Sequence, residues 1–144
     1  YGKPMADGVK TAIVAPERLV ISQQALSGTV PGTEGYFTVM GEHAPLMSTL
    51  KPGFITVTDM SNFAHVFYVR GGFADVAPDG LTILAEQALP LAEFDPASID
   101  ADIQAAEVKL AAATTLEEKS AATEEVDAWR NLKLEAQQGA APAH

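Results

Sequence analysis

Short apolar runs, each bounded by turn-forming residues, occupy the first two thirds of the chain. The runs are rich in β-branched and aromatic residues, and within 54–59 the positions alternate with the period of two typical of a half-buried strand. Pro-Gly, Gly-Gly and Pro-Asp-Gly sequences separate the runs. The predicted strands are 9–15, 18–22, 25–30, 36–40, 46–50, 54–59, 64–70, 73–76, 81–85 and 88–91. About ten strands without a helical pattern between them predict an all-β sandwich over residues 1–92.

The hydrophobic pattern changes at Phe94-Asp95-Pro96. Asp95 suits the N-cap of a helix, and Pro96 suits the first helical position, where no backbone N–H is needed. An apolar stripe with helical spacing follows, made of Ile99, Ile103, Ala106 and Leu110. The pattern predicts a helix of about 18 residues that ends at Thr114-Thr115.

A second helix is predicted directly after the first. Thr115-Leu116-Glu117-Glu118 has the pattern of a capping box. The apolar stripe behind it is Ala122, Val126, Trp129 and either Leu132 or Lys133. Gly139 and Pro142 are expected to end this helix. Because the link between the helices is short, residues 93–144 are predicted to form an antiparallel two-helix hairpin with a short frayed tail.

Charge narrows the choice of partners. The net charge is −10, of which residues 93–144 contribute −7 (eleven acids, four bases) and residues 1–92 contribute −3 (eight acids, five bases). This balance argues against nucleic acid and against direct adsorption to anionic lipid. No apolar run approaches the roughly 20 residues that span a bilayer, so we expect no direct membrane insertion. There are no cysteines, which excludes disulfides and thiolate metal sites.

No motif for catalysis, nucleotide binding or metal binding stands out. A P-loop is missing, and Gly71-Gly72 precedes a predicted strand, so a tight turn is the better interpretation. The three histidines are far apart in the sequence, and Glu42 and His43 are adjacent on an extended segment, where their side chains point to opposite faces. We therefore predict a non-catalytic protein without cofactor or metal.

Four apolar side chains cluster around a loop rich in glycine and proline. They are Tyr36, Phe37, Met40 and Met47. One interpretation is that all four pack in the core. The other follows from strand alternation, which turns some of them outward at one end of the sandwich, where apolar loop residues are typical of a docking surface.

The same region resembles the epsilon subunit of F-type ATP synthases, whose mitochondrial equivalent is called delta. The likeness rests on residues 31–46, 50–53, 71–76 and 81–86, with 14–19 similar to the family's first strand. The series Gly32-x2-Gly35, His43-Ala44-Pro45, Lys51-Pro52-Gly53 and Gly71-Gly72 is long and specific. The resemblance covers residues 9–138, including the order of sandwich and hairpin.

The resemblance implies a non-catalytic rotor subunit of the central stalk, which links the gamma subunit to the c-ring and couples proton flow to ATP synthesis. It would be a peripheral protein on the ATP-producing side of the coupling membrane, held there by protein contacts only. The residues implied at the c-ring are Gly32, Thr33, Glu34, Gly35, Tyr36, Ala44 and Pro45. Those implied at gamma are His43 and Ser48.

Two departures from the family concern the hairpin. Some bacterial members bind ATP through an Ile/Leu-Asp-x2-Arg-Ala motif, but Ile103 stands here in place of the arginine, which removes the strongest phosphate partner. In some relatives, basic hairpin residues pair with acidic loops of the catalytic subunits, and a hairpin at net −7 would approach those loops with like charge. We therefore predict little or no ATP binding and weak autoinhibition.

Two other functions compete with the rotor subunit. One is a small-ligand-binding β-sandwich module with a helical tail for oligomerisation, which requires convergent polar residues on the sandwich. The other is an enzyme with an active site scattered along the chain.

Overall fold

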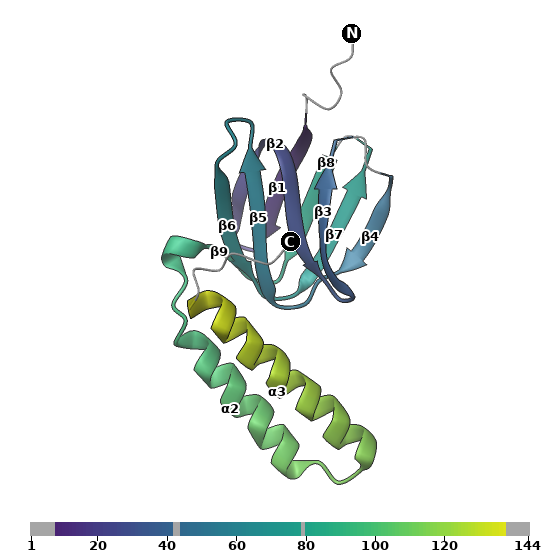
Figure 1. Cartoon of the computed structure of the whole chain (residues 1–144), viewed down its shortest axis with the longest axis vertical. Coiled ribbons are helices and arrows are strands. Elements are labelled where there is room, and N and C mark those ends of the chain that lie inside the picture. The colour runs from purple at the N-terminus through teal and green to yellow at the C-terminus, as the bar shows by residue number, and fades with distance from the viewer. Residues whose placement is uncertain (1–7, 42–43, 79, 138–144) are drawn as a thin grey trace. The chain divides into compact units, whose positions relative to one another are not determined.

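The computed structural model describes residues 8–41, 44–78 and 80–137. Within them the chain forms two compact units, and the division falls between Phe94 and Asp95 (Figure 1). The first unit is built of strands and the second of helices. No helix in this part of the chain combines the length and the apolarity needed to cross a bilayer.

Nine strands make up the described part of the first unit. They are β1 (Val9–Ala15), β2 (Arg18–Gly32), β3 (Gly35–Met40), β4 (Leu46–Thr49), β5 (Gly53–Asp59), β6 (Ala64–Val69), β7 (Gly72–Ala77), β8 (Gly80–Ala85) and β9 (Ala88–Pro90). A 3₁₀ turn, η1 (Leu91–Glu93), follows β9. All pairings are antiparallel except that of β1 with β8.

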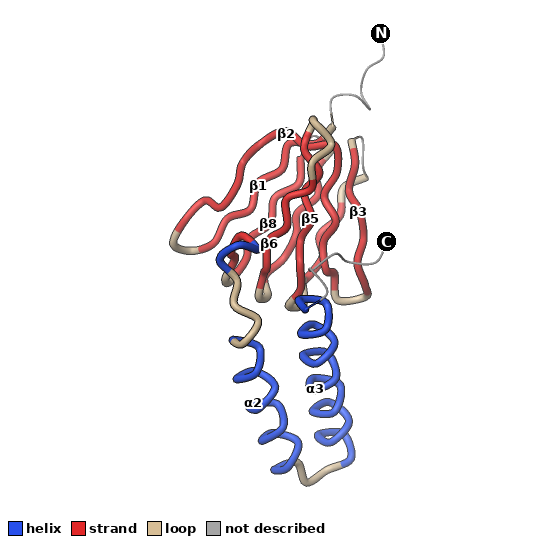
Figure 2. Tube along the Cα trace, turned by 60° about the vertical axis from the view of Figure 1, so that its left-hand side comes forward, coloured by secondary structure: helices blue, strands red, loops and turns tan. Residues whose placement is uncertain are grey.

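The long strand β2 connects the two layers of the sandwich. Hydrogen bonding runs in the order β4-β7-β8-β1-β2-β5-β6-β9, with β3 also paired to β2. The N-terminal half of β2 pairs with β1 and the C-terminal half with β3 and β5, with a register shift between Ala25 and Ser27. Such an irregularity lets one strand bend and join both sheets (Figures 1 and 2). The predicted strands 18–22 and 25–30 are therefore one strand, and the sandwich has nine strands among the described residues.

The core lies between the inward faces of the two layers. Ile13, Ile55, Val57, Leu81 and Ile83 are fully buried there. The alternation predicted for β5 is present, because Ile55 and Val57 are buried while Thr56 and Thr58 are partly exposed.

Phe54 is an exception to the alternation, since it lies on the outward side of β5 and is also fully buried. Its ring packs against Tyr68, with centroids 5.7 Å apart, and edge-on against Phe94 at 5.6 Å. Tyr68 and Phe94 stack at 4.4 Å. This aromatic cluster ties the end of the first unit to β5 and β6.

The second unit is a hairpin of α2 (Ser98–Ala112) and α3 (Leu116–Gln137). Helix α2 begins two residues later than predicted, because Pro96 and Ala97 form a turn. Asp95 nevertheless accepts a hydrogen bond from the Ala97 N–H at its Oδ1, 3.0 Å away. The first helix has 15 residues rather than the predicted 18 or so.

The predicted stripes and capping box are present. Ile99 and Ala106 are buried on α2, where Ile103 and Leu110 are half-buried, and α3 buries Ala122, Val126, Trp129 and Leu132. Leu132, not Lys133, completes the stripe of α3. In the capping box, Thr115 Oγ1 accepts from the Glu118 N–H at 3.1 Å, and Glu118 Oε1 accepts from the Thr115 N–H at 3.3 Å. Gly139 and Pro142 lie outside the described residues.

Candidate functional site

The turn between β2 and β3 carries most of the predicted c-ring contacts. Gly32 pairs with Gly35, which leaves Thr33 and Glu34 exposed at the tip. The Thr33 N–H donates to the Thr49 carbonyl at 3.1 Å, so the tip is attached to the end of β4. A short, anchored turn of this kind can present its two exposed side chains in a fixed position.

Tyr36, the next predicted residue, packs back onto the sandwich. Its hydroxyl accepts a hydrogen bond from the Phe54 N–H at 3.2 Å. A Cβ on Gly53 would lie 3.0 Å from this hydroxyl and 2.7 Å from Pro31 Cβ, so only glycine fits at position 53 without movement. The glycine of the Lys-Pro-Gly motif and the Tyr36 side chain thus belong to one packing arrangement.

Ala44 and Pro45 lie at the opposite end of β3 from this turn. Both are exposed, and they follow the strand that begins at Gly35 and ends at Met40. A strand of that length separates its ends by about 17 Å. The structure therefore does not bring the seven residues implied at the c-ring into one cluster (Figure 1). His43 lies outside the described residues.

Ser48, implied at gamma, is half-buried in β4. It pairs with the buried Ala74 of β7, and its hydroxyl donates to the Thr49 carbonyl at 3.1 Å. Because neighbours along a strand point to opposite faces, Met47 points to the outer face of the sheet, where it is 64% exposed.

Met47 lies at one end of an apolar row over five strands. It pairs with Asp75 of β7 and is diagonal to Phe73, whose direct partner on β4 is Thr49. Phe73 of β7 pairs with Leu84 of β8, and Leu84 pairs with Val14 of β1. Val14 in turn pairs with Leu19 of β2. Paired residues share a face, so these side chains lie side by side on the outside of one layer. We call Leu19, Val14, Leu84, Phe73 and Met47 the apolar row.

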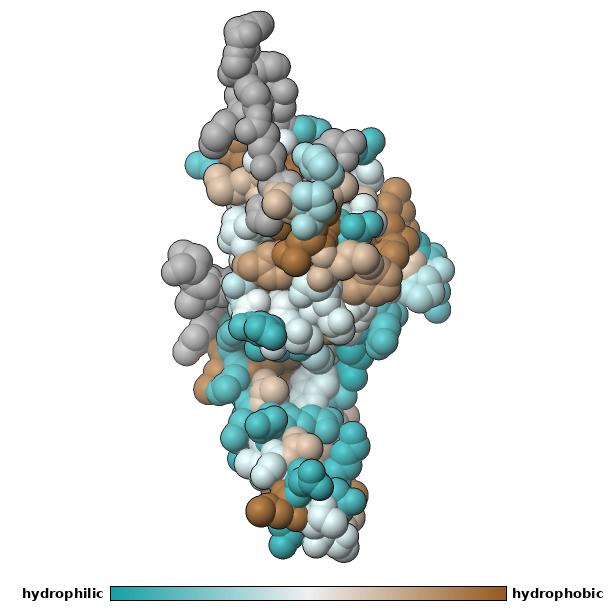
Figure 3. All heavy atoms as spheres, turned by 90° about the vertical axis from the view of Figure 1, so that its right-hand side faces the viewer, coloured by the Kyte–Doolittle hydropathy of each residue, from teal (hydrophilic) through white to brown (hydrophobic). Residues whose placement is uncertain are grey.

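The apolar row is exposed over most of its length. Leu19 is 60% exposed, Leu84 41% and Phe73 37%. An open hollow of about 300 Å³ lies at the Met47 end and is lined by Met47, Ser48, Thr49, Gly72 and Phe73. Figure 3, which shows the side of the molecule that is on the right in Figure 1, has apolar residues gathered over this side of the sandwich. Exposed apolar side chains that gather on one face are typical of a docking surface.

Gly72 keeps the two central strands of this surface close together. It has φ +113°, and a Cβ there would lie 2.1 Å from the Leu84 carbonyl oxygen. Gly71 forms a bend with φ +75°, and Gly72 is the first residue of β7, so a strand rather than a helix follows, as the sequence predicts. The function of Gly72 here is to let β7 approach β8, which sets Phe73 beside Leu84.

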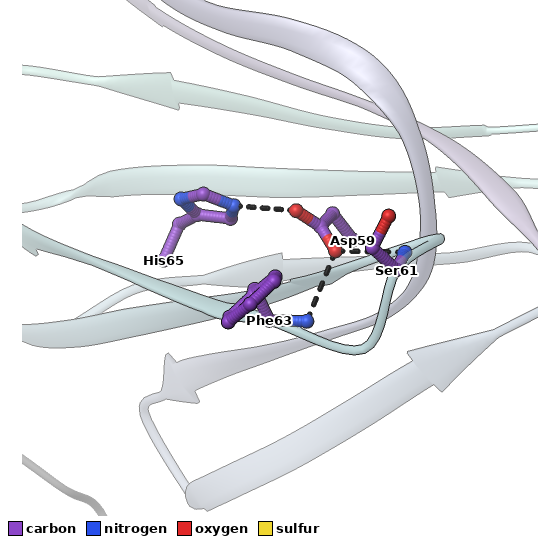
Figure 4. A network of polar contacts seen from close by, with 4 residues as sticks. All are labelled: Asp59, Ser61, Phe63 and His65. Atoms are coloured by element: carbon purple, nitrogen blue, oxygen red, sulfur yellow. Dashed lines mark hydrogen bonds and ion pairs between the residues drawn. The ribbon is translucent and has the colours of Figure 1, made fainter.

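A polar network that the sequence did not single out lies at the β5–β6 connection (Figure 4). Asp59 Oδ1 accepts from the Ser61 N–H at 2.9 Å and from the Phe63 N–H at 3.0 Å, and Oδ2 accepts from His65 Nε2 at 2.7 Å. The His65 hydrogen bond, then that of Phe63, holds the pKa of Asp59 below its ordinary value. The carboxylate is fully used in shaping the loop, so we assign it a structural function.

Other polar groups also serve the structure. A cleft of about 590 Å³ at one end of the sandwich is lined by charges of both signs, among them Arg18, Arg70, Glu86 and Glu93. Arg18 and Glu93 form an exposed ion pair there at 3.2 Å. Within the described residues, no group of three or more histidine, aspartate or glutamate side chains is placed to hold a metal ion.

In the hairpin, the positions that match the family's nucleotide motif have structural partners. Ile103 lies half-buried on the apolar stripe of α2. Asp100 is paired with Lys133 of α3 at 2.6 Å.

Comparison with known proteins gives one consistent result. The model of the ATP synthase delta/epsilon chain β-sandwich domain matches residues 9–91. The ATP synthase epsilon chain of Parvibaculum lavamentivorans is 40% identical over 129 residues, covering 90% of this chain and 98% of that protein. The epsilon chain of Hyphomonas neptunium is 48% identical over 106 residues, covering 74% and 78%.

The fold is also similar to a chain in the structure of the Euglena gracilis mitochondrial ATP synthase (OSCP/F1/c-ring), with TM-score 0.70, 19% identity, and coverage of 92% of this chain and 82% of that one. The match of sequence over both the sandwich and the hairpin, together with the matching fold, shows that this chain belongs to the ATP synthase delta/epsilon chain family.

Proposed function

We propose that this chain is a non-catalytic central-stalk subunit of a proton-translocating F-type ATP synthase. It joins gamma to the c-ring and turns with them, so that rotation driven by proton flow reaches the sites where ATP is made. Its place is on the ATP-producing side of the coupling membrane, held by protein contacts. Family membership supports this function, and in the structure the apolar row carries it.

Gamma is the partner that we assign to the apolar row. The row crosses five strands and ends at the hollow that Ser48 also lines, and the family resemblance implies Ser48 at gamma. A rotor subunit needs a broad contact that does not slip, and apolar area with interlocking side chains provides it. Ala44 and Pro45, which the resemblance implies at the c-ring, directly precede β4 of the row, so we propose that they lie where gamma and the c-ring meet.

The c-ring contact is assigned to the anchored turn formed by Gly32, Thr33, Glu34 and Gly35. This turn lies at the other end of β3 from Ala44 and Pro45. The turn adjoins the Met47 end of the apolar row, because the Thr33 N–H donates to the Thr49 carbonyl and Thr49 lines the hollow there. Two adjoining contact regions would let this end of the sandwich hold both partners where they meet.

The gamma contact is tested with Leu84→Glu, a change at a partly exposed side chain in the middle of the row. We expect it to weaken binding to purified gamma at least tenfold, because a charge would be buried against an apolar partner. Thr38→Glu is the matched control, since Thr38 is an exposed strand residue on β3 outside the row. Equal affinity of Leu84→Glu and the unchanged chain, measured by calorimetry, would contradict the assignment.

The hairpin is proposed to bind ATP poorly and to inhibit weakly. Ile103 supplies no charge for phosphate, and Lys109, Arg130 and Lys133 are each paired within the hairpin. In calorimetry, a micromolar dissociation constant for ATP would overturn the first statement. Removal of residues 95–144 should leave ATP hydrolysis by the assembled enzyme nearly unchanged, and a severalfold rise would overturn the second.

A further inference from the structure

The hairpin uses most of its basic side chains to hold its own helices together. It contains four of them, and three form ion pairs with the opposite helix: Lys109 with Glu125, Arg130 with Glu107, and Lys133 with Asp100. The fourth, Lys119, makes no ion pair in the part of the chain that the structure describes. We call the three pairs the ion-pair ladder.

The ladder encloses the apolar seam from both sides. Asp100 and Glu107 are seven residues apart on α2, which is two helical turns, so they lie on one flank. Lys109 is two residues beyond Glu107 and therefore points to the other flank. The Lys109–Glu125 pair braces that second flank, with Nζ 3.3 Å from Oε1.

The seam is not equally filled along its length. Ile99, Trp129 and Leu132 are buried in the half of the hairpin near Asp95. In the half near the α2–α3 loop, a hollow of about 380 Å³ is lined by Lys109, Ala112, Ala113, Glu118, Ala121, Ala122 and Glu125. Alanine side chains bury little apolar area, so this loop half gains little from hydrophobic packing.

We propose that the Lys109–Glu125 pair is a salt-sensitive latch that closes the loop half of the hairpin. It spans the hollow, and its side chains are 66% and 39% exposed, so dissolved salt reaches and screens the pair. An exposed ion pair is worth at most about 1 kcal/mol, so only where packing is thin can it shift the equilibrium between closed and parted helices, and then by a few-fold. The proposal concerns the hairpin alone and does not depend on the rotor function.

The test measures the distance between the two helices of the full chain in solution. The chain has no cysteine, so Ala111→Cys and Ser120→Cys place one spin label on each helix near the loop, both at exposed positions. We expect the short distance to dominate at roughly 0.01 M salt, where the Debye length is about 30 Å, with a minor longer-distance population. At roughly 1 M salt, where it is about 3 Å, the longer-distance population should grow.

Lys109→Gln should enlarge that longer-distance population already at low salt, with the ratio of parted to closed forms raised roughly 1.5- to 5-fold. Lys119→Gln makes the same change of charge on the same hairpin without removing an interhelix pair, so it should behave like the unchanged chain. Exchange of the two charges, Lys109→Glu with Glu125→Lys, should restore the distance distribution of the unchanged chain. If Lys109→Gln leaves the distances unchanged, or Lys119→Gln matches its effect, the latch does not exist.

Discussion

At the scale of single residues, the Asp59 carboxylate stabilises the loop between β5 and β6, and we assign it no catalytic function. It caps the loop that presents Phe63, which is 69% exposed, and it accepts from two backbone N–H groups and from His65. Asn62 in the same loop has φ +70°, a conformation that asparagine tolerates better than most residues. The carboxylate therefore fixes a tight and otherwise unfavourable loop.

The Asp59 network should make stability depend on pH in a defined direction. Because folding lowers the pKa of Asp59, its contribution is fully present above the unfolded value, near pH 4, and is lost as the pH falls through the lower folded value. Asp59→Asn should therefore be less stable than the unchanged chain at neutral pH, and the difference should shrink on acidification. Urea unfolding at a series of pH values measures it, and a difference that stays constant to pH 2 would contradict the assignment.

The apolar row illustrates what residue patterns leave open. Alternation along β4, β7 and β8 predicts that some apolar side chains point outward, which left core packing and docking as alternatives for Met47. Which outward side chains become neighbours depends on strand order and register, and β1 joins β8 only through a parallel pairing between distant segments. No linear motif contains that information, so Leu19, Phe73 and Leu84 were missed.

At the scale of elements, the predictions succeeded where local chemistry decides. The Thr115–Glu118 capping box forms as predicted, and Glu118 also accepts from the Thr114 N–H at 2.9 Å. The hydrogen bonds from Thr114, then from Thr115, lower the pKa of Glu118. Two boundaries were predicted less well. Helix α2 begins after a turn at Pro96, and β2 continues through a bend near Ala25. Both depend on tertiary packing and not on the local sequence.

Thr115→Ala tests the capping box. It removes the acceptor for the Glu118 N–H and should lower the stability of α3 by about 1 kcal/mol. Thr123→Ala is the matched control on the same helix, where the hydroxyl only donates to the Lys119 carbonyl and the change to alanine should be neutral or slightly stabilising. Hydrogen exchange of the first turn of α3 measures both, and equal protection in the two variants would contradict the cap.

At the scale of the whole molecule, the two predicted contact regions depend on where β3 begins and ends. The motif residues from Gly32 to Pro45 are close in sequence, which made them look like one site. A six-residue strand places its start and its end at opposite ends of the sandwich, so Ala44 and Pro45 lie away from the turn. Strand β4 then returns to the turn, where Thr49 accepts from the Thr33 N–H. Sequence motifs thus identified the candidate contact residues. Which of these residues lie close together could be seen only from the order and length of the strands.

The boundary between the two units also depends on tertiary packing. The sequence places it at residue 92, whereas the described structure divides after Phe94, whose ring packs on Tyr68 and Phe54. A sandwich that ends at Phe94 should therefore be more stable than one that ends at Ala92. Burial of the ring is worth about 2 kcal/mol, which corresponds to a melting temperature roughly 8–16 °C higher for a domain of this size.

Calorimetric melting of chains 1–94 and 1–92 measures this difference, and Phe94→Ala in the longer chain separates the ring from the added length. Since Glu93 and its exposed partner Arg18 contribute little, the Phe94→Ala chain should melt close to chain 1–92. If it instead melts with the unchanged chain 1–94, Phe94 does not anchor the sandwich. The unit would then end at η1, and the aromatic stack would be a contact without consequence for stability.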